Sequence, residues 1–457
     1  MRRILLLMLL SLPLLAQATS TRIEPGVRQA LQQQDVVQVV VAFEPDRPTT
    51  LAVADRAQRR VSIARTTDSI VQSAGPGFAV SHRFELISAV YGQANSDALR
   101  GLEKHPQVRS IGLDVGGSGH NDVSLPLLGI DYIQAPRPDG LGLDGDGIKV
   151  VVLDSGIDAT HPTFAGALQA EACFCFNPNN HCCPNGEPSQ FGTGAAADDH
   201  GHGTWVSGQI LGRGVDSPLG VAPAADLVSV KMLSANNSFW SAGDIAASYE
   251  WVAINHPDAA VLNASLGTFA TSAQQCDSAV TWTIPISEAA ALLTANGTVL
   301  VASTGNQGRQ GIQVPSCLAD VIAVGATWKQ DVDGSFPFSF FPDACAEPQV
   351  DPRQDEVACF SNTAPILDLL APGVPMKTSA LGGGEINGIA GTSFAAPLVA
   401  GCAALIRQSF PNETPQQIKA RMMRSPVRVT DPRNNQEFPR LDCLDAIEWL
   451  FADRFGL

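Results

Sequence analysis

Short apolar runs alternate with longer, helix-like segments in the part of the chain after residue 141. The short runs are almost continuously apolar, which is typical of strands buried on both faces of a parallel sheet. They predict strands at 148–153, 226–232, 260–264, 298–303 and 321–326. The longer segments predict helices at 203–212, 242–255, 286–296, 392–409, 414–424 and 442–453. Because strands and helices alternate, we expect an α/β fold with a parallel sheet and helices on both of its faces.

A different order of elements is predicted before residue 115. It runs strand, helix, two strands or a bent hairpin, helix, strand, at 36–43, 49–73, 78–93, 96–105 and 108–114. This βαββαβ order is that of a ferredoxin-like sandwich. We therefore expect a small α+β domain over residues 19–115. A glycine-rich polar linker at 116–124 joins it to a second domain over 125–457.

The first 18 residues have the three parts of a secretory signal peptide. Arg2 and Arg3 supply positive charge, residues 4–16 form an apolar stretch too short to span a bilayer as a mature helix, and Ala16-Gln17-Ala18 is a cleavage motif. A membrane anchor is the alternative, which this length disfavours. We expect a secreted protein, extracellular or periplasmic, with no membrane anchor. Its formal net charge of −16 argues against a nucleic-acid partner, which would require a basic face.

Ten cysteines in an exported chain predict disulfides. Four of them, Cys173, Cys175, Cys182 and Cys183, crowd into a segment at 165–197 that we interpret as an insertion. With His181 they also allow a zinc site, although their spacing lacks paired C-x-x-C elements. In the helix predicted at 392–409, Cys402 is either a buried free thiol or a partner for Cys443.

Three short stretches carry side chains suited to nucleophilic catalysis. IKVVVLDSGID (148–158) places Asp154 at the carboxyl end of a predicted strand, where open α/β sheets place their sites. DDHGHGTWVSG (198–208) carries His200 and His202. GTSFAAPLVAG (391–401) places Ser393 at the start of a helix, where backbone N–H groups suit an oxyanion, with Pro397 expected in the first turn. Taken alone, such a serine is more often a helix cap.

The order Asp154, His202, Ser393 and the three motifs resemble those of the subtilisin-like serine proteases, the subtilases. The resemblance implies a subtilisin-like fold and peptide-bond hydrolysis through an acyl-enzyme. The HGT pattern places the general base at His202 rather than His200, with Asp154 orienting it and Ser393 as the nucleophile. Asn306, in the Gly-Asn pair after the strand at 298–303, matches the asparagine whose side-chain amide donates to the oxyanion in the family. The Ser393 backbone N–H would be the second donor.

The resemblance also implies partners. NASLGT (263–268) resembles the family's specificity-pocket segment, which assigns Ser265, Leu266 and Gly267 to substrate binding. Gly305, before Asn306, is expected to keep the wall of the pocket open. A peptide or protein substrate would bind as an added strand along this backbone and along residues near 237–241. No acid can be placed in the pocket, so we expect an apolar or neutral residue before the scissile bond. The domain at 19–115 resembles the family's inhibitory propeptide, which would make it an intramolecular inhibitor of a monomeric enzyme.

The chain departs from the family pattern at several positions. Trp205 follows HGT where a histidine is usual, and Phe394 and Leu398 replace the commoner Met and His, which we interpret as packing changes. No cofactor is expected. Calcium stays open, because GRGVDSP (212–218) differs from the calcium loop of the best-known members. Two alternative functions stay open: a peptide ligase or acyltransferase using the same three residues, and an inactive subtilase-fold binding protein.

Overall fold

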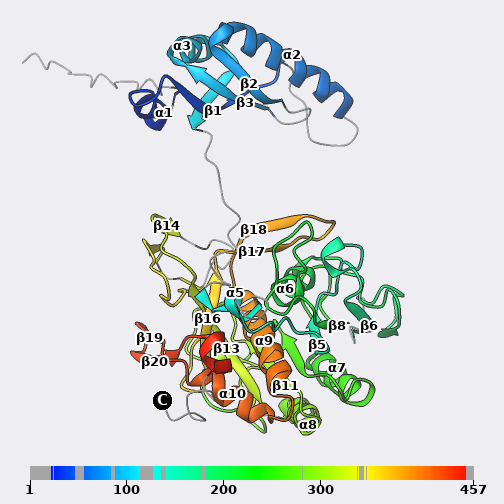
Figure 1. Cartoon of the computed structure of the whole chain (residues 1–457). Helices are drawn as coiled ribbons and strands as arrows, with labels where there is room; N and C mark the ends of the chain where they lie inside the picture. The colour runs from blue at the N-terminus through cyan, green and yellow to red at the C-terminus, as the bar shows by residue number, and fades with distance from the viewer. Residues whose placement is uncertain are drawn as a thin grey trace, which may run out of the picture. The chain divides into compact units, whose positions relative to one another are not determined.

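The structure is a computed structural model (Figure 1). It divides into two compact units, Met1–Ser118 and Gly119–Leu457. The expected signal peptide and linker lie outside the described residues, as does His181. The structure describes residues 22–23, 25–46, 56–83, 88–113, 127–134, 140–175, 182–239, 241–279, 281–336, 338, 344–345 and 347–448.

The first unit has the predicted ferredoxin-like arrangement. Its four-stranded sheet has the order β2-β3-β1-β4, with every neighbouring pair antiparallel, and α2 and α3 lie together over it (Figure 1). Alternate residues of β1, including Val39 and Val41, are buried with Ile63 and Ile70 of α2. A short helix before β1 was not predicted. The elements are α1 (Pro25–Ala30), β1 (Val36–Phe43), α2 (Arg56–Ala74), β2 (Phe78–Arg83), β3 (Ala89–Asn95), α3 (Ser96–Lys104) and β4 (Val108–Leu113).

The second unit is built on an eight-stranded sheet in which all neighbours are parallel except the last pair, β6 and β7. Its five inner strands match the five predicted, with bounds shifted by one or two residues. In sheet order the strands are β16 (Leu369–Val374), β13 (Val321–Trp328), β11 (Val299–Ser303), β9 (Val261–Ala264), β5 (Lys149–Asp154), β8 (Asp226–Lys231), β6 (Leu168–Phe174) and β7 (Ser189–Phe191).

Helices cover both faces of this sheet, as predicted. Successive residues of a strand point to opposite faces, so Val150 and Val152 of β5 pack in one core with α6 and α9, while Val151 and Leu153 pack in the other with α7 and α8. The helices of each pair contact each other (Figure 1). They are α6 (His202–Leu211), α7 (Ala242–Asn255), α8 (Ile284–Ala295) and α9 (Thr392–Ser409), followed by α10 (Pro415–Met423).

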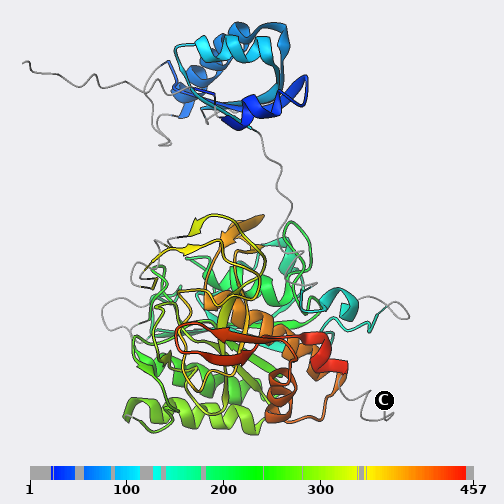
Figure 2. The same ribbon diagram turned by 90° about the vertical axis from the view of Figure 1, so that its left-hand side faces the viewer.

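The remaining elements surround these layers. A short helix, α5 (Ile130–Gln134), precedes the sheet, and residues 443–448 are the described part of the predicted last helix. Figure 2 shows the hairpin of β19 and β20 in red. The two-stranded pairs are β10 (Thr271–Ser272) with β12 (Ile312–Gln313), β14 (Ser335–Phe336) with β15 (Gln349–Val350), β17 (Met376–Ser379) with β18 (Glu385–Ile389), and β19 (Arg428–Asp431) with β20 (Gln436–Pro439).

All ten cysteines form disulfides. In the segment 165–197, Cys173 on β6 pairs with Cys183 and Cys175 pairs with Cys182. Disulfide pairing replaces the zinc alternative for these four. Cys402 of α9 pairs with Cys443, so it is not a free thiol. The other two bridges are Cys276–Cys317 and Cys345–Cys359. Among the described helices none is long and apolar enough to cross a membrane.

Candidate active site

Asp154 and His202 meet at the carboxyl end of the sheet. Asp154 is the last residue of β5 and His202 the first of α6, and His202 Nδ1 lies 2.7 Å from Asp154 Oδ1. A carboxylate only accepts, so Nδ1 carries the hydrogen and Nε2 keeps its lone pair when the ring is neutral. The structure gives Nε2 no hydrogen-bond partner among the residues it describes. The imidazole is therefore arranged to accept a proton at Nε2.

The electrostatic surroundings of His202 favour its charged form. Burial disfavours the imidazolium and lowers the pKa of His202, but the negative charge of Asp154 and the hydrogen bond with it raise that pKa by more. The charge of Asp198 acts in the same direction. The net pKa of His202 lies above its ordinary value, so the site stabilises the imidazolium that forms when a proton is taken up.

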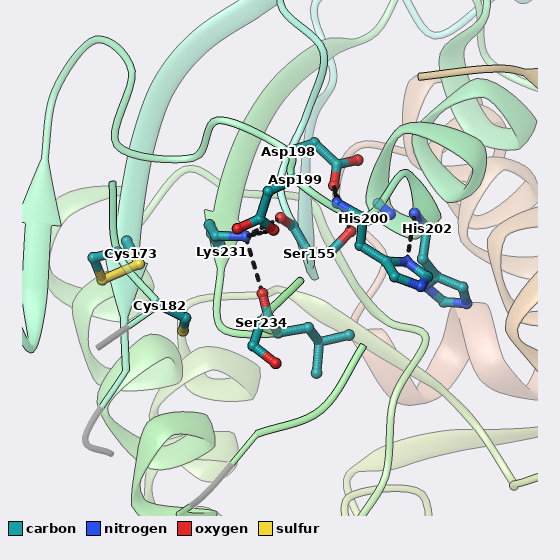
Figure 3. Close-up of polar contacts among 12 residues, drawn as sticks. Ser155, Cys173, Cys182, Asp198, Asp199, His200, His202, Lys231 and Ser234 are labelled. Atoms are coloured by element: carbon teal, nitrogen blue, oxygen red, sulfur yellow. Dashed lines mark hydrogen bonds and ion pairs between the residues drawn. A yellow bond between two sulfur atoms is a disulfide. The ribbon is translucent and has the colours of Figure 1, made fainter. Parts of the chain in front are cut away.

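Asp198 orders the loop that leads into α6. Its Oδ1 accepts from the backbone N–H groups of His200 (3.0 Å) and Gly201 (2.8 Å) and from the Ser155 hydroxyl (2.8 Å). Its Oδ2 accepts from the N–H and hydroxyl of Thr204 (3.0 and 2.6 Å). Burial raises the pKa of Asp198, yet these hydrogen bonds lower it by more, so the carboxylate stays charged. Asp198 thus fixes the backbone that carries His202 (Figure 3).

Lys231 fixes the loop before His202 through buried hydrogen bonds. Its side chain is fully buried, and its Nζ donates to Asp199 Oδ1 (2.6 Å) and to the carbonyls of Ser155 (2.7 Å) and Leu233 (3.0 Å) (Figure 3). Three acceptors satisfy the three N–H bonds of the ammonium group, which a buried charge requires. Lys231 lies beside Asp154 in the register of β8 and β5, so it links the residue after Asp154 to the loop before His202.

The histidine that bonds to Asp154 is His202 and not His200. The Nδ1 of His200 accepts from the backbone N–H of His202 at 3.3 Å. Burial and the neighbouring charge of His202 lower the pKa of His200. The rings of Trp205 and Phe394 flank His202 at centroid distances of 6.2 and 5.6 Å. These two departures from the family pattern therefore pack against the imidazole.

Ser393 lies in the first turn of α9, which begins at Thr392. Pro397 lies inside the helix rather than in its first turn, which corrects the sequence prediction. A proline has no N–H to donate to the carbonyl four residues before it, which here is that of Ser393. That carbonyl instead accepts from the Ser265 hydroxyl at 2.8 Å, while the Ser393 hydroxyl donates to the Ser265 carbonyl at 3.2 Å. Pro397 thereby joins the start of α9 to the segment after β9.

The side chain of Asn306 has one defined orientation. Its Oδ1 accepts from the backbone N–H and the hydroxyl of Thr392, both at 2.8 Å. Because a backbone N–H only donates, the Asn306 atom that faces it must be the oxygen. Asn306 and Ser393 line the same cavity, and the structure gives the Asn306 amide nitrogen no hydrogen-bond partner among the residues it describes. This nitrogen is therefore available as a donor to a group bound in that cavity.

Asn362 holds the loop that carries Asn306. Its side chain is fully buried; Oδ1 accepts from the N–H groups of Gln307 and Arg309 (both 3.0 Å), and Nδ2 donates to the Thr304 carbonyl (3.1 Å) and to Gln307 Oε1 (3.0 Å). Gly305 has a φ of +106°, and a Cβ there would lie 2.5 Å from Asn362 Nδ2. The loop therefore requires glycine at 305 and is fixed by Asn362.

One cavity brings the predicted substrate-binding residues together with Ser393 and Asn306. Ser265, Leu266, Gly267 and Gly305 all line it. Asn263, the first residue of a glycosylation sequon, is fully buried. The described residues include no group of three or more His, Cys, Asp and Glu side chains placed to hold a metal ion.

Sequence reasoning missed Asp198, Lys231, Asn362 and Gln313, another residue that lines the cavity. Lys231 and Asn362 act through contacts with loops far away in the chain, which no local motif reveals. For Asp198 there was a signal: a carboxylate four residues before His202, next to the helix start, is placed to bond free N–H groups.

The chain is similar to several known proteins. A family model described as the subtilase family matches residues 145–439, more than half of the chain. A thermostable alkaline protease of Halalkalibacterium halodurans is 30% identical over 355 residues, covering 77% of this chain and 81% of that protein. Subtilisin Savinase of Lederbergia lenta is 35% identical over 293 residues, covering 64% and 87%. A solved cold adapted subtilisin-like serine proteinase has the same fold, with a TM-score of 0.50 at 24% identity over 69% of this chain and 97% of that chain.

Proposed function

Since the chain belongs to the subtilase family of serine proteases, we propose that it hydrolyses peptide bonds through an acyl-enzyme formed on Ser393. The proposal is carried by three parts that are joined where the ring of His202 packs against that of Phe394, the residue after Ser393, at a centroid distance of 5.6 Å. They are the 2.7 Å contact between Asp154 and His202, the unpartnered Nε2 of that histidine, and a cavity that Ser393 and Asn306 both line.

In the first half of the reaction, Ser393 Oγ attacks the carbonyl carbon of the scissile bond while its proton passes to His202 Nε2. Asp154 holds the ring in the required tautomer and stabilises the imidazolium. The tetrahedral oxyanion accepts from the Asn306 amide and from the Ser393 backbone N–H. His202 then gives its proton to the leaving amine, the C–N bond breaks, and an ester to Ser393 remains.

In the second half, His202 takes a proton from a water molecule, which attacks the ester. The same donors stabilise the second oxyanion. The C–O bond to Ser393 then breaks, the proton returns to Ser393 Oγ, and the carboxylic acid product leaves. Before substrate binds, the Ser393 hydroxyl donates to the Ser265 carbonyl. A rotation about its Cα–Cβ bond exchanges that acceptor for His202.

The proposal includes export and processing. Residues 1–18 serve as a signal peptide and residues 19–115 as an inhibitory propeptide. Five disulfides that pair all ten cysteines support an oxidising compartment, because such bridges persist outside the cytosol. The substrates are proteins or peptides, and the mature enzyme acts as a monomer outside the cell or in the periplasm.

A peptidyl phosphonate that reacts with activated serines tests the proposal. We expect the purified mature chain to gain the mass of one phosphonyl group and to lose activity in proportion. Peptide mapping should place the group on Ser393. Activity that survives stoichiometric labelling, or a label on another residue, would show that Ser393 is not the nucleophile.

A further inference from the structure

The cavity beside Ser393 has a volume of about 360 Å³. Two of the glycines that line it face one common space, here called the slot, because a Cβ added at either would lie within 2.6 Å of the same side-chain atom. One is Gly267, after β9, and the other is Gly305, after β11. Neither residue has a side chain, so a slot of this construction would be open to a large residue of the substrate if nothing else entered it.

Gln313 enters it. This residue ends β12, and its backbone N–H donates to the Thr304 carbonyl at 3.2 Å, next to Gly305. Its side chain reaches both glycines: a Cβ added at Gly267 would lie 2.5 Å from Gln313 Oε1, and one added at Gly305 would lie 2.6 Å from the same atom. The Gln313 amide therefore occupies the space between the two glycines.

Gln313 is also a polar group held in place without a visible partner. It is only 6% exposed, and the structure gives its side-chain amide no hydrogen bond within the described residues. Its amide atoms are accessible from the cavity that Gln313 lines, so a ligand there can offer them a donor or an acceptor. Among the described residues that line the cavity there is no Asp, Glu, Lys, Arg or His, so these residues offer a charged ligand no counter-charge for its desolvation.

We propose that Gln313 restricts the substrate residue before the scissile bond to small, uncharged side chains such as those of alanine and serine. This inference rests on the proposed function, because it takes the slot beside Ser393 as the place of that residue. Long and aromatic side chains are excluded by the volume of Gln313. Acidic and basic ones are excluded by the lack of a counter-charge, while a serine hydroxyl can also pair with the free amide.

The test is a series of peptide anilides that differ only in the residue before the scissile bond: Ala, Ser, Leu, Phe, Glu and Lys. For the processed enzyme we expect kcat/KM to be at least about tenfold higher for Ala and Ser than for Phe, a usual ratio for a size-limited pocket. Gln313→Gly should open the slot and raise the Phe/Ala ratio by tenfold or more, with Gln313→Ala intermediate. Gln416→Ala removes an exposed amide from α10, outside the cavity, so it should leave the ratio unchanged.

A wild-type enzyme that prefers Phe, or a Phe/Ala ratio that does not rise in Gln313→Gly, would overturn the inference. If thermal unfolding shows that Gln313→Gly does not fold, the Phe/Ala ratio of kcat/KM is measured for Gln313→Ala and Gln313→Ser, and a ratio that does not rise in them overturns the inference. Failure of the proposed function gives a different result, in which the wild-type enzyme hydrolyses none of the six peptides and takes up no phosphonate.

Discussion

At the scale of single residues, each part of the site is fixed by neighbours that limit what it can do. Asp154 orients His202, Thr392 orients the amide of Asn306, and Asn362 orients the loop beneath Asn306. The roles of Asp154, His202, Ser393 and Asn306 could be proposed from local motifs, because the chemistry needs particular groups at particular spacings. Their supports could not, because a buried Asn or Lys is recognised only by the distant backbone that it contacts.

The ionisation of His202 sets the pH dependence of peptide hydrolysis. His202 must be neutral to accept the Ser393 proton, and its pKa is raised above the ordinary value by the charge of Asp154, despite the opposing effect of burial. Activity is therefore low below that pKa and rises with pH through it. We expect kcat/KM to rise with a midpoint above about 6.5, the unperturbed value for histidine.

Asp154→Asn supplies the control for this profile. It keeps the size of the side chain but removes its charge, so the midpoint should fall and kcat should drop by about 10⁴-fold, as expected for loss of the correct tautomer. An unchanged midpoint in the variant, with chemistry rate-limiting, would contradict the assignment of Asp154.

Asn306→Ala should lower kcat by about 10²–10³-fold with little change in KM, since the amide is needed only when charge develops on the oxyanion. Asn306→Asp retains the oxygen that accepts from Thr392 but lacks the donor, so it should lose at least as much. If the Asp variant keeps its activity, Asn306 serves only to shape the turn.

At the scale of elements, the helices and strands that carry the site were largely predictable. The five inner strands and the bounds of α7 and α9 follow from apolar periodicity, and Thr414 and Gln417 form the capping box expected at the start of α10. The outer strands of the sheet were not predicted from this periodicity. β16 contains a proline and a glycine, and β6 contains Gln169 and Glu171, so both lack the continuous apolar run of a buried strand.

The loop from Thr304 to Arg309 gives a prediction at this scale. Asn362→Ala removes four hydrogen bonds to the loop and leaves buried backbone groups unpaired, at a cost of about 1–3 kcal/mol for each such group. We expect a lower thermal midpoint and a fall in kcat of at least tenfold at nearly constant KM. In an Asn306→Ala background the same change should lower kcat little further. Additive effects in the double variant would mean that Asn362 does not act through Asn306.

At the scale of the whole molecule, the two units each have a core of their own, so each is expected to fold alone. The sequence predicted both units from the order of their elements. It could not predict the disulfide pairing or the slot that Gln313 enters, because both depend on which distant segments meet.

The role of the first unit can be tested in trans. Residues 19–118, expressed alone, should inhibit the mature enzyme in competition with a peptide substrate, because the polar tail that follows β4 can bind along the substrate edge as a product does. The N-terminus of the mature enzyme should lie between residues 115 and 125. Absence of inhibition, together with a mature chain that begins at Thr19, would make this unit a permanent accessory domain.

The central claim is that Ser393 is the nucleophile, and the kinetics of Ser393→Ala test it most directly. In the structure the Ser393 hydroxyl donates to one carbonyl at 3.2 Å, so its loss should leave the thermal midpoint nearly unchanged, as should the surface control Ser272→Ala. We predict that Ser393→Ala lowers kcat by on the order of 10⁶-fold and leaves a precursor of residues 19–457, while Ser272→Ala matures and hydrolyses peptides normally. A folded and processed Ser393→Ala enzyme that hydrolyses peptides at a rate near that of the wild-type enzyme would contradict the account.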